Sequence, residues 1–217
     1  MLSVEEARAR ILAALSPVGA EWVGIGEAWG RVLAAPVTAR HDKPLHDVSA
    51  MDGFAVREAD CAAIPVRLNV IGSAPAGHPF AGTVGPGEAV RLFTGSVIPE
   101  GADAVIIQED TDHDGTEGAA AVEIRFVPRP GQHIRRRAGD FAAGATLLSP
   151  GRRLTARDIG IAASADRPWL AVHRRPRVAI LSTGDEVARP GEPVPEGGVI
   201  SSNSLALAAM VRASGGE

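Results

Sequence analysis

Cysteine is almost absent from this sequence of 217 residues, with Cys61 as its single occurrence. One cysteine excludes a disulfide within the chain and is typical of a reducing compartment. Long apolar runs are also absent, because no stretch approaches the roughly 20 residues that a bilayer-spanning helix needs. The first residues, MLSVEE, lack the basic-then-apolar order of a signal peptide. We therefore expect a cytoplasmic protein with no membrane contact.

Lysine is equally scarce, since Lys43 is the only one, and tyrosine does not occur. The 22 basic residues face 26 acidic ones, which gives a formal net charge of -4. A negative balance argues against nucleic-acid binding, which needs a positive field to neutralise phosphates. Because nearly every basic residue is arginine, an isolated arginine carries little functional meaning, and only a cluster of arginines merits interpretation.

Capping-box patterns predict the start of a helix at two places in the chain. Ser3 and Glu6 form a capping box, and the apolar periodicity that follows predicts an amphipathic helix that Pro17 ends. A second capping-box pattern, Thr155 with Asp158, predicts a helix that runs to about residue 165.

Short β-type runs with Gly- and Pro-rich turns lie between these helices. Several short strands with such turns are typical of a small β-sandwich or barrel. The runs are 66–71, 89–93, 104–108 and 122–127. The acidic stretch 110–117 predicts an exposed hairpin loop.

The last part of the chain has the order strand, loop, helix. The apolar run 178–181 predicts a strand covered on both faces, and Ser202 or Asn203 could cap a helix from Ser204 to Ala213. One strand and one helix cannot cover each other's apolar surfaces, so we expect this region to be incomplete. We predict a multi-domain α+β fold. A helical linker domain (1–41 and 141–174) contains an inserted small β-rich, barrel- or sandwich-like domain (42–140), and an α/β domain starts at 175–217.

The segment LSTGDE at 181–186 is the sharpest candidate for a binding site. Ligands of α/β sheets bind beyond the carboxyl ends of strands, where Ser182 and Thr183 offer hydroxyls and Gly184 allows a phosphate to approach the backbone. Asp185 and Glu186 offer oxygen ligands for Mg²⁺. A polar turn with its acids in water is the alternative interpretation.

Two further turns contain candidate residues. Asp52 comes just before an apolar run, where it could be a metal ligand or a base, or an ordinary Asp-Gly turn. Thr94 and Ser96 flank a glycine after a strand, where their hydroxyls could donate to an oxyanion or satisfy the turn.

The only dense basic cluster is RRR at 135–137, followed by Asp140. Guanidinium groups bind phosphates in a bidentate manner, although alternate residues of an extended segment face opposite sides. A solvated run of charge is the alternative. Cys61 is better explained as a packed residue than as a nucleophile, because no basic neighbour activates it.

Taken in order, several segments resemble the MoeA family of molybdenum insertases, which includes the E domain of gephyrin. They are VEEAR (4–8), GRVLA (30–34), SAMDGFAV (49–56), RLFTG (91–95), PEGADAV (99–105), IRRRAGD (134–140) and RPRVAILSTGDE (175–186). The resemblance implies an enzyme that uses Mg²⁺ to insert molybdenum from molybdate into adenylylated molybdopterin, with release of AMP. It also implies a homodimer, a MogA-like molybdopterin adenylyltransferase as upstream partner, and a molybdopterin-binding role for the α/β region.

The resemblance assigns roles residue by residue. It implies catalysis by Asp52, Thr94 and Asp140, substrate or phosphate binding by Ser96, Arg135, Ser182, Thr183 and Gly184, and metal binding by Asp185 and Glu186. The resemblance implies that family members continue well past Glu217, so we expect this chain alone to be inactive. A smaller departure is Asp166, where the family commonly has glycine. A dimerising scaffold or regulatory module without catalysis is the alternative function.

Overall fold

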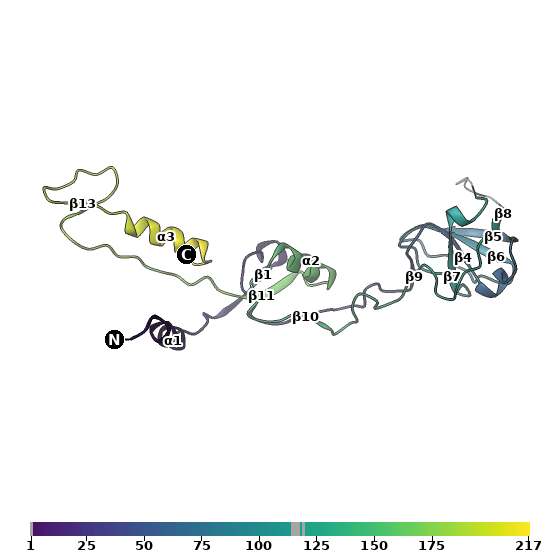
Figure 1. The fold of residues 1–217 in the computed structure, drawn as a ribbon, viewed down its shortest axis with the longest axis horizontal. Coiled ribbons are helices and arrows are strands. Elements are labelled where there is room, and N and C mark those ends of the chain that lie inside the picture. The colour runs from purple at the N-terminus through teal and green to yellow at the C-terminus, as the bar shows by residue number, and fades with distance from the viewer. Residues whose placement is uncertain (1, 114–117, 119) are drawn as a thin grey trace. The chain divides into compact units, whose positions relative to one another are not determined.

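The computed structural model of the chain describes residues 2–113, 118 and 120–217 (Figure 1). It has two compact units, one formed by Met1–Thr38 with Thr146–Glu217 and the other by Ala39–Ala145. Within the described residues, no helix has the length and apolar character required to cross a membrane. The predicted combination of a β-rich region with few helices is confirmed.

A five-stranded mixed sheet forms the centre of the unit Ala39–Ala145. Its order is β7-β4-β6-β5-β8, and only β5 and β6 run parallel. The strands are β4 (Gly53–Val56), β5 (Val66–Ala74), β6 (Glu88–Leu92), β7 (Ala104–Ile107) and β8 (Ala121–Ile124). Both faces are covered: Phe54 and Val56 belong to one apolar cluster, whereas Ala55 belongs to a second one with Val90 and Leu92. The alternation of side chains along each strand produces this division.

The four β-type runs of the sequence become β5, β6, β7 and β8, so these predictions are confirmed. The strand β4, which lies between β7 and β6, was not predicted as a strand. All four of its residues are buried, and a strand of four residues that is buried on both faces shows no alternation of apolar and polar residues.

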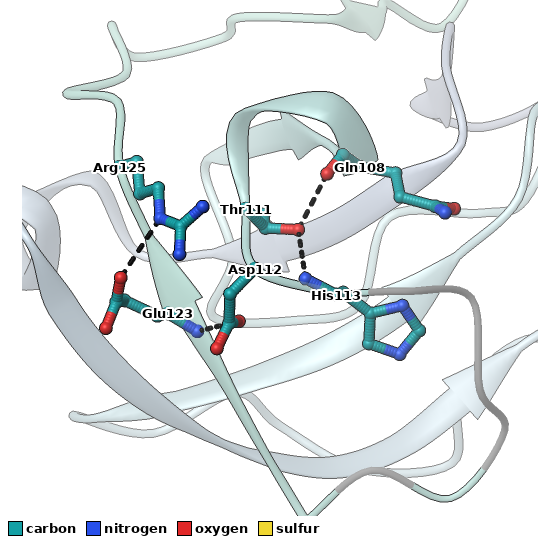
Figure 2. Close-up of polar contacts among 6 residues, drawn as sticks. All are labelled: Gln108, Thr111, Asp112, His113, Glu123 and Arg125. Atoms are coloured by element: carbon teal, nitrogen blue, oxygen red, sulfur yellow. Dashed lines mark hydrogen bonds and ion pairs between the residues drawn. The ribbon is translucent and has the colours of Figure 1, made fainter.

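The chain after β7 crosses to the opposite edge of the sheet through the short helix η3 (Gln108–Asp110). There Thr111 bridges Ile124, the Asp112 amide donates to the Glu123 carbonyl at 3.2 Å, and the Arg125 amide donates to Asp110 at 3.0 Å. Figure 2 shows this corner, with Thr111 turned inward and bonded to Gln108. The predicted exposed loop is therefore wrong at Thr111, which is buried, while 114–117 lie outside the described residues.

The unit formed by Met1–Thr38 and Thr146–Glu217 is built on two short antiparallel strand pairs. β1 (Ala20–Gly24) pairs with β11 (Trp169–His173), and β2 (Val37–Thr38) pairs with β10 (Thr146–Leu148). Helix α2 (Ala156–Ser164) begins at the predicted capping box, and α1 (Val4–Ala14) begins at the box of Ser3 and Glu6, so both helix starts are confirmed. Other short elements of the chain are η1 (Ile25–Glu27), η2 (Glu58–Cys61), and the paired strands β3 (Val48–Ser49) and β9 (Ile134–Arg135).

The run 178–181 is not a strand, contrary to the prediction. It pairs with no strand among the described residues, and Leu181 is 85% exposed. A parallel strand needs neighbours for its backbone hydrogen bonds, and the one such bond here runs from the Val178 amide to the Glu217 carbonyl at 2.8 Å. A parallel pair of β12 (Val187–Ala188) and β13 (Val199–Ile200) follows instead.

The predicted last helix is present as α3 (Asn203–Ala213). Its predicted cap is not formed, because Ser202 has helical backbone angles and its side chain accepts no amide. The division of the chain at residues 39 and 145 lies close to the predicted limits of 42 and 140, while the molybdopterin-binding character of 175–217 stays a prediction.

Candidate functional site

Asp52 and Thr94 meet at one end of the central sheet. Gly53 at the start of β4 pairs with Leu92 at the end of β6, so the residues just outside the two strands lie opposite each other. The Thr94 amide and hydroxyl each donate to Asp52 Oδ1 at 2.7 Å. These two bonds, from the side chain first and then the backbone, lower the pKa of the Asp52 carboxyl, with a smaller contribution from the charge of Arg91.

The backbone around Asp52 is held tightly. The Gln108 amide donates to the Asp52 carbonyl at 3.1 Å. At Gly53 a Cβ atom would lie 1.9 Å from the carbonyl oxygen of Ile106, so only glycine fits between β4 and β7. Asp52 therefore sits on a rigid element while its side chain stays exposed.

Ser96 has no exposed surface. Its hydroxyl accepts a hydrogen bond from the Phe93 amide at 3.2 Å, and its carbonyl accepts one from the Ser49 amide at 2.8 Å. Of the two interpretations of this hydroxyl, the turn-forming one therefore holds, and the predicted phosphate contact is not available at Ser96.

Each arginine of the cluster 135–137 is paired with an aspartate. Arg135 Nη2 lies 3.0 and 3.2 Å from the two carboxylate oxygens of Asp140. Arg136 pairs with Asp47 at 2.6 Å, and Arg137 pairs with Asp42 at 2.5 Å. The two interpretations of this cluster were an anion-binding site and a run of charge surrounded by water. Neither describes it fully, because each of the three arginines forms an ion pair with an aspartate of the same unit.

Backbone bonds explain the depressed pKa values of these aspartates. The Ala143 amide donates a hydrogen bond to Asp42 Oδ1, and the Arg137 amide donates one to Asp47 Oδ1. These hydrogen bonds are the main causes that lower the pKa of each carboxyl. Asp42 and Asp47 thus fasten the 136–143 segment to the segment that enters β3.

The pair of Arg135 and Asp140 is connected to the pair of Asp52 and Thr94 through β3. Val48 of β3 lies opposite Arg135 of β9, and the Ser49 carbonyl accepts the Gly95 amide at 2.9 Å. The segment 48–52 therefore lies opposite Arg135 at its start and carries Asp52 at its end. The structure brings Asp52 together with Thr94 and Arg135 together with Asp140, and this segment connects the two pairs through the backbone.

The remaining predicted site residues, 182–186, belong to the unit formed by Met1–Thr38 and Thr146–Glu217. All five are exposed. Gly184 has a φ of 137°, and a Cβ there would lie 2.5 Å from both carboxylate oxygens of Glu186, so the Glu186 side chain folds back over this glycine. No group of three His, Cys, Asp or Glu side chains suited to a metal ion occurs among the described residues. Asp185 and Glu186 supply two carboxylates, which is the number that suits Mg²⁺ arriving with substrate phosphates.

Sequence reasoning missed Arg91 and Gln108, which flank Asp52 in space. Arg91 is the single basic residue of β6, an otherwise apolar strand apart from Glu88 at its start. A cation inside a buried strand is a signal that could have been used, since charged residues are seldom placed there without partners.

Comparison with known proteins identifies the family. A family model described as the MoeA N-terminal region, domains I and II, matches residues 2–165. The chain belongs to the MoeA family. The resemblance of the ordered segments is thereby confirmed.

Relatives and solved structures agree with this membership. The chain is 43% identical over 201 residues to a molybdopterin molybdenumtransferase of Nostoc sp., covering 91% of the chain and 45% of the relative. It is 40% identical over 222 residues to molybdopterin molybdenumtransferase 2 of Mycobacterium tuberculosis H37Rv, covering 99% and 53%. The crystal structure of a molybdopterin biosynthesis MoeA protein from Pyrococcus horikoshii OT3 matches with a TM-score of 0.91 and 31% identity, covering 100% of this chain and 58% of that one. The chain spans about half the length of these relatives.

Proposed function

We propose that this MoeA chain contributes the Asp52 and Thr94 site to a molybdopterin molybdenumtransferase. The reaction inserts molybdenum from molybdate into adenylylated molybdopterin and releases AMP. The names of the relatives support the reaction class. The observation that carries the proposal is the exposed carboxylate of Asp52, fixed by two bonds of 2.7 Å from Thr94 on a rigid strand end.

Asp52 acts as an anion in this proposal. Because its pKa is lowered by the Thr94 bonds, the carboxylate is charged at neutral pH and accepts protons or binds cations rather than donating. Its Oδ1 is occupied by Thr94, which leaves Oδ2 for a water or a substrate hydrogen. Asp52 therefore orients a proton-bearing group at the reacting centre.

Arg135 and Asp140 form an exchangeable anion contact. Their side chains are 54% and 40% exposed, so the ion pair is solvated and contributes little to stability. A substrate phosphate can replace Asp140 on the guanidinium, which binds both anions in the same geometry. Asp140 keeps Arg135 oriented until that exchange.

Ser182, Thr183 and Gly184 are proposed to contact substrate phosphate, and Asp185 with Glu186 would hold Mg²⁺ together with that phosphate. The ion would neutralise the negative charge that develops on the phosphoryl oxygens. A MogA-like adenylyltransferase would supply the substrate, and the buried free thiol of Cys61 fits the proposed cytoplasmic location.

The test is a transfer assay on the protein isolated at its natural length. Adenylylated molybdopterin and Mg²⁺ are supplied with and without molybdate, and AMP and molybdenum cofactor are measured. We expect AMP release to depend on molybdate. Folded protein that binds the substrate but releases no AMP under either condition would refute the proposed reaction.

We also propose a homodimer that uses an exposed aromatic surface. Trp22 and Trp169 are 70% and 60% exposed, and Trp169 pairs with Gly24, two residues from Trp22 on the same face of the β1 and β11 pair. Exposed tryptophans of this kind are enriched at interfaces. Light scattering of the natural-length protein should give twice the monomer mass, and Trp22→Ser with Trp169→Ser should lower it; a monomeric wild type would reject the homodimer.

A further inference from the structure

Arg91 is a cation held inside the sheet mainly by neutral groups. Its Nη1 lies 3.4 Å from the Gly53 carbonyl, and its Nη2 donates to the side-chain oxygen of Gln108. The guanidinium carbon lies 5.0 Å from the centre of the Phe54 ring and 5.3 Å from that of Phe93. Two aromatic faces and two neutral acceptors fix a planar guanidinium in orientation, which a flexible ammonium could not match.

The two hydrogen bonds of Arg91 go to residues that adjoin the Asp52 backbone, namely Gly53 and Gln108. Gly53 follows Asp52 directly, and the Gln108 amide donates to the Asp52 carbonyl at 3.1 Å. Gln108 thus joins Arg91 to Asp52, through its side chain on one side and its backbone on the other. Gln108 follows β7, and its carbonyl accepts the Thr111 hydroxyl at 2.7 Å, as Figure 2 shows, so it is itself anchored in the corner.

The orientation of Gln108 follows from the chemistry of arginine. A guanidinium only donates hydrogen bonds, so the Gln108 amide must turn its oxygen to Arg91 and its NH₂ group away. Burial lowers the pKa of Arg91. The negative charge of the exposed Asp52 opposes this decrease, and Glu109 acts in the same direction. The interaction is reciprocal, because the charge of Arg91 also favours the ionised form of Asp52.

We propose that Arg91, acting through Gln108 and the Gly53 carbonyl, is the positioning residue for the Asp52 carboxylate. It fixes the backbone that carries Asp52 and supplies the cation beside it, while Thr94 fixes the side chain. Arg91 does not touch substrate. This inference rests on the proposed function of Asp52.

The test compares four variants of the natural-length protein in the transfer assay: Arg91→Met, Arg91→Lys, Asp52→Asn and, as a matched control, Arg125→Met. Arg125 is an exposed arginine of the same unit whose partner is Glu123 at 3.0 Å. For each variant kcat, KM and the pH dependence of kcat/KM are measured, and circular dichroism checks the fold.

We expect Arg91→Met to lower kcat about 100-fold and Arg91→Lys about 10-fold, which is the range found when groups that orient a reacting residue are removed. The acid limb of kcat/KM should move to higher pH in Arg91→Met, because the positive charge that favours the Asp52 anion is gone. Arg125→Met should behave as wild type. If Arg91→Met fails to fold, the kcat of Arg91→Lys decides, because lysine keeps the charge but not the oriented guanidinium: a wild-type kcat in that variant would overturn the inference.

Two results would overturn the inference in distinguishable ways. An inactive Asp52→Asn beside an Arg91→Met enzyme with wild-type kcat and acid limb would reject the positioning role and leave the proposed function in place. A fully active Asp52→Asn would remove the proposed site itself, and the inference with it.

Discussion

At the residue scale, one neighbour makes both hydrogen bonds to the side chain of Asp52. Thr94 supplies both hydrogen bonds to Asp52 Oδ1, one from its backbone and one from its hydroxyl. Only the hydroxyl bond can be removed by substitution, and it is the largest cause of the lowered pKa.

Thr94→Val should therefore raise the pKa of Asp52 toward the ordinary value for aspartate. A carboxyl whose pKa is lowered by folding stabilises the protein above its unfolded pKa, and this contribution is lost as the pH falls through the folded pKa. Thr94→Val should thus weaken the acid dependence of stability. Carbon NMR titration of the Asp52 carboxyl measures the shift. Thr83→Val, which changes an exposed threonine of the same unit, is the control. An unchanged pKa of Asp52 in Thr94→Val would show that the hydroxyl bond is unimportant.

Asp166 is a residue whose backbone is unsuited to it. Asp166 has a φ of 57° just after α2. Its amide donates a hydrogen bond to the Ala163 carbonyl, and the Arg167 amide donates one to the Ala162 carbonyl. This is the Schellman pattern, in which glycine is the favoured residue. The resemblance to the MoeA family had marked this position, because it led us to expect glycine there.

Asp166→Gly should raise the free energy of unfolding by about 0.5 to 1 kcal/mol. A left-handed conformation costs a non-glycine residue roughly 1 to 2 kcal/mol, and the greater backbone entropy that glycine loses on folding offsets roughly 0.5 to 1 kcal/mol of this. Ala163→Gly within the same helix is the control and should lower it by about 1 kcal/mol. Urea denaturation measures both; destabilisation by Asp166→Gly would mean that contacts of the aspartate outweigh the strain.

At the element scale, sequence predicted best where a local rule acts. Both capping boxes depend on residues three apart, and both occur at the predicted positions. β4 and the run 178–181 are both short apolar runs in sequence, yet β4 pairs on both sides and 178–181 pairs with no strand in the part of the chain that the structure describes. Non-local neighbours decide whether such a run is a strand, and sequence periodicity does not record them.

The start of α2 shows how much one cap contributes. Asp158 is fully buried, and its Oδ2 accepts the Thr155 amide at 2.8 Å and hydroxyl at 2.7 Å. Arg152 lies 2.9 Å from Oδ1 as an ion pair. Burial alone would raise the pKa of Asp158, but the Thr155 bonds and Arg152 together lower it.

Asp158→Ala should lower the free energy of unfolding by about 1 to 2 kcal/mol, as expected for loss of a helix cap. The loss should be largest at neutral pH and shrink in acid, because the wild-type carboxylate stabilises only while it is ionised. Arg157→Ala, an exposed neighbour on the same helix, is the control. Thermal unfolding at several pH values measures both, and equal effects of the two changes would contradict the role of the cap.

At the scale of the whole molecule, the ordered motifs predicted the family and the structure located their residues. Asp52, Thr94, Arg135 and Asp140 are far apart in sequence but lie on elements joined by the segment 48–52. That grouping could not be derived from spacing, because it depends on the pairing of β3 with β9 and of β4 with β6. Arg91 was missed for the same reason: its partners come from two other strand ends.

The proposed function requires that Asp52 serves molybdenum transfer, and one comparison tests this role most directly. The rate of AMP release is measured for natural-length wild type, Asp52→Asn and Glu123→Gln, the last being a carboxylate of the same unit that is paired with Arg125. Asp52→Asn should lose at least about 100-fold in kcat, as is typical when a group that accepts a proton is removed, while Glu123→Gln stays near wild type. A folded Asp52→Asn protein with wild-type rate would contradict the account.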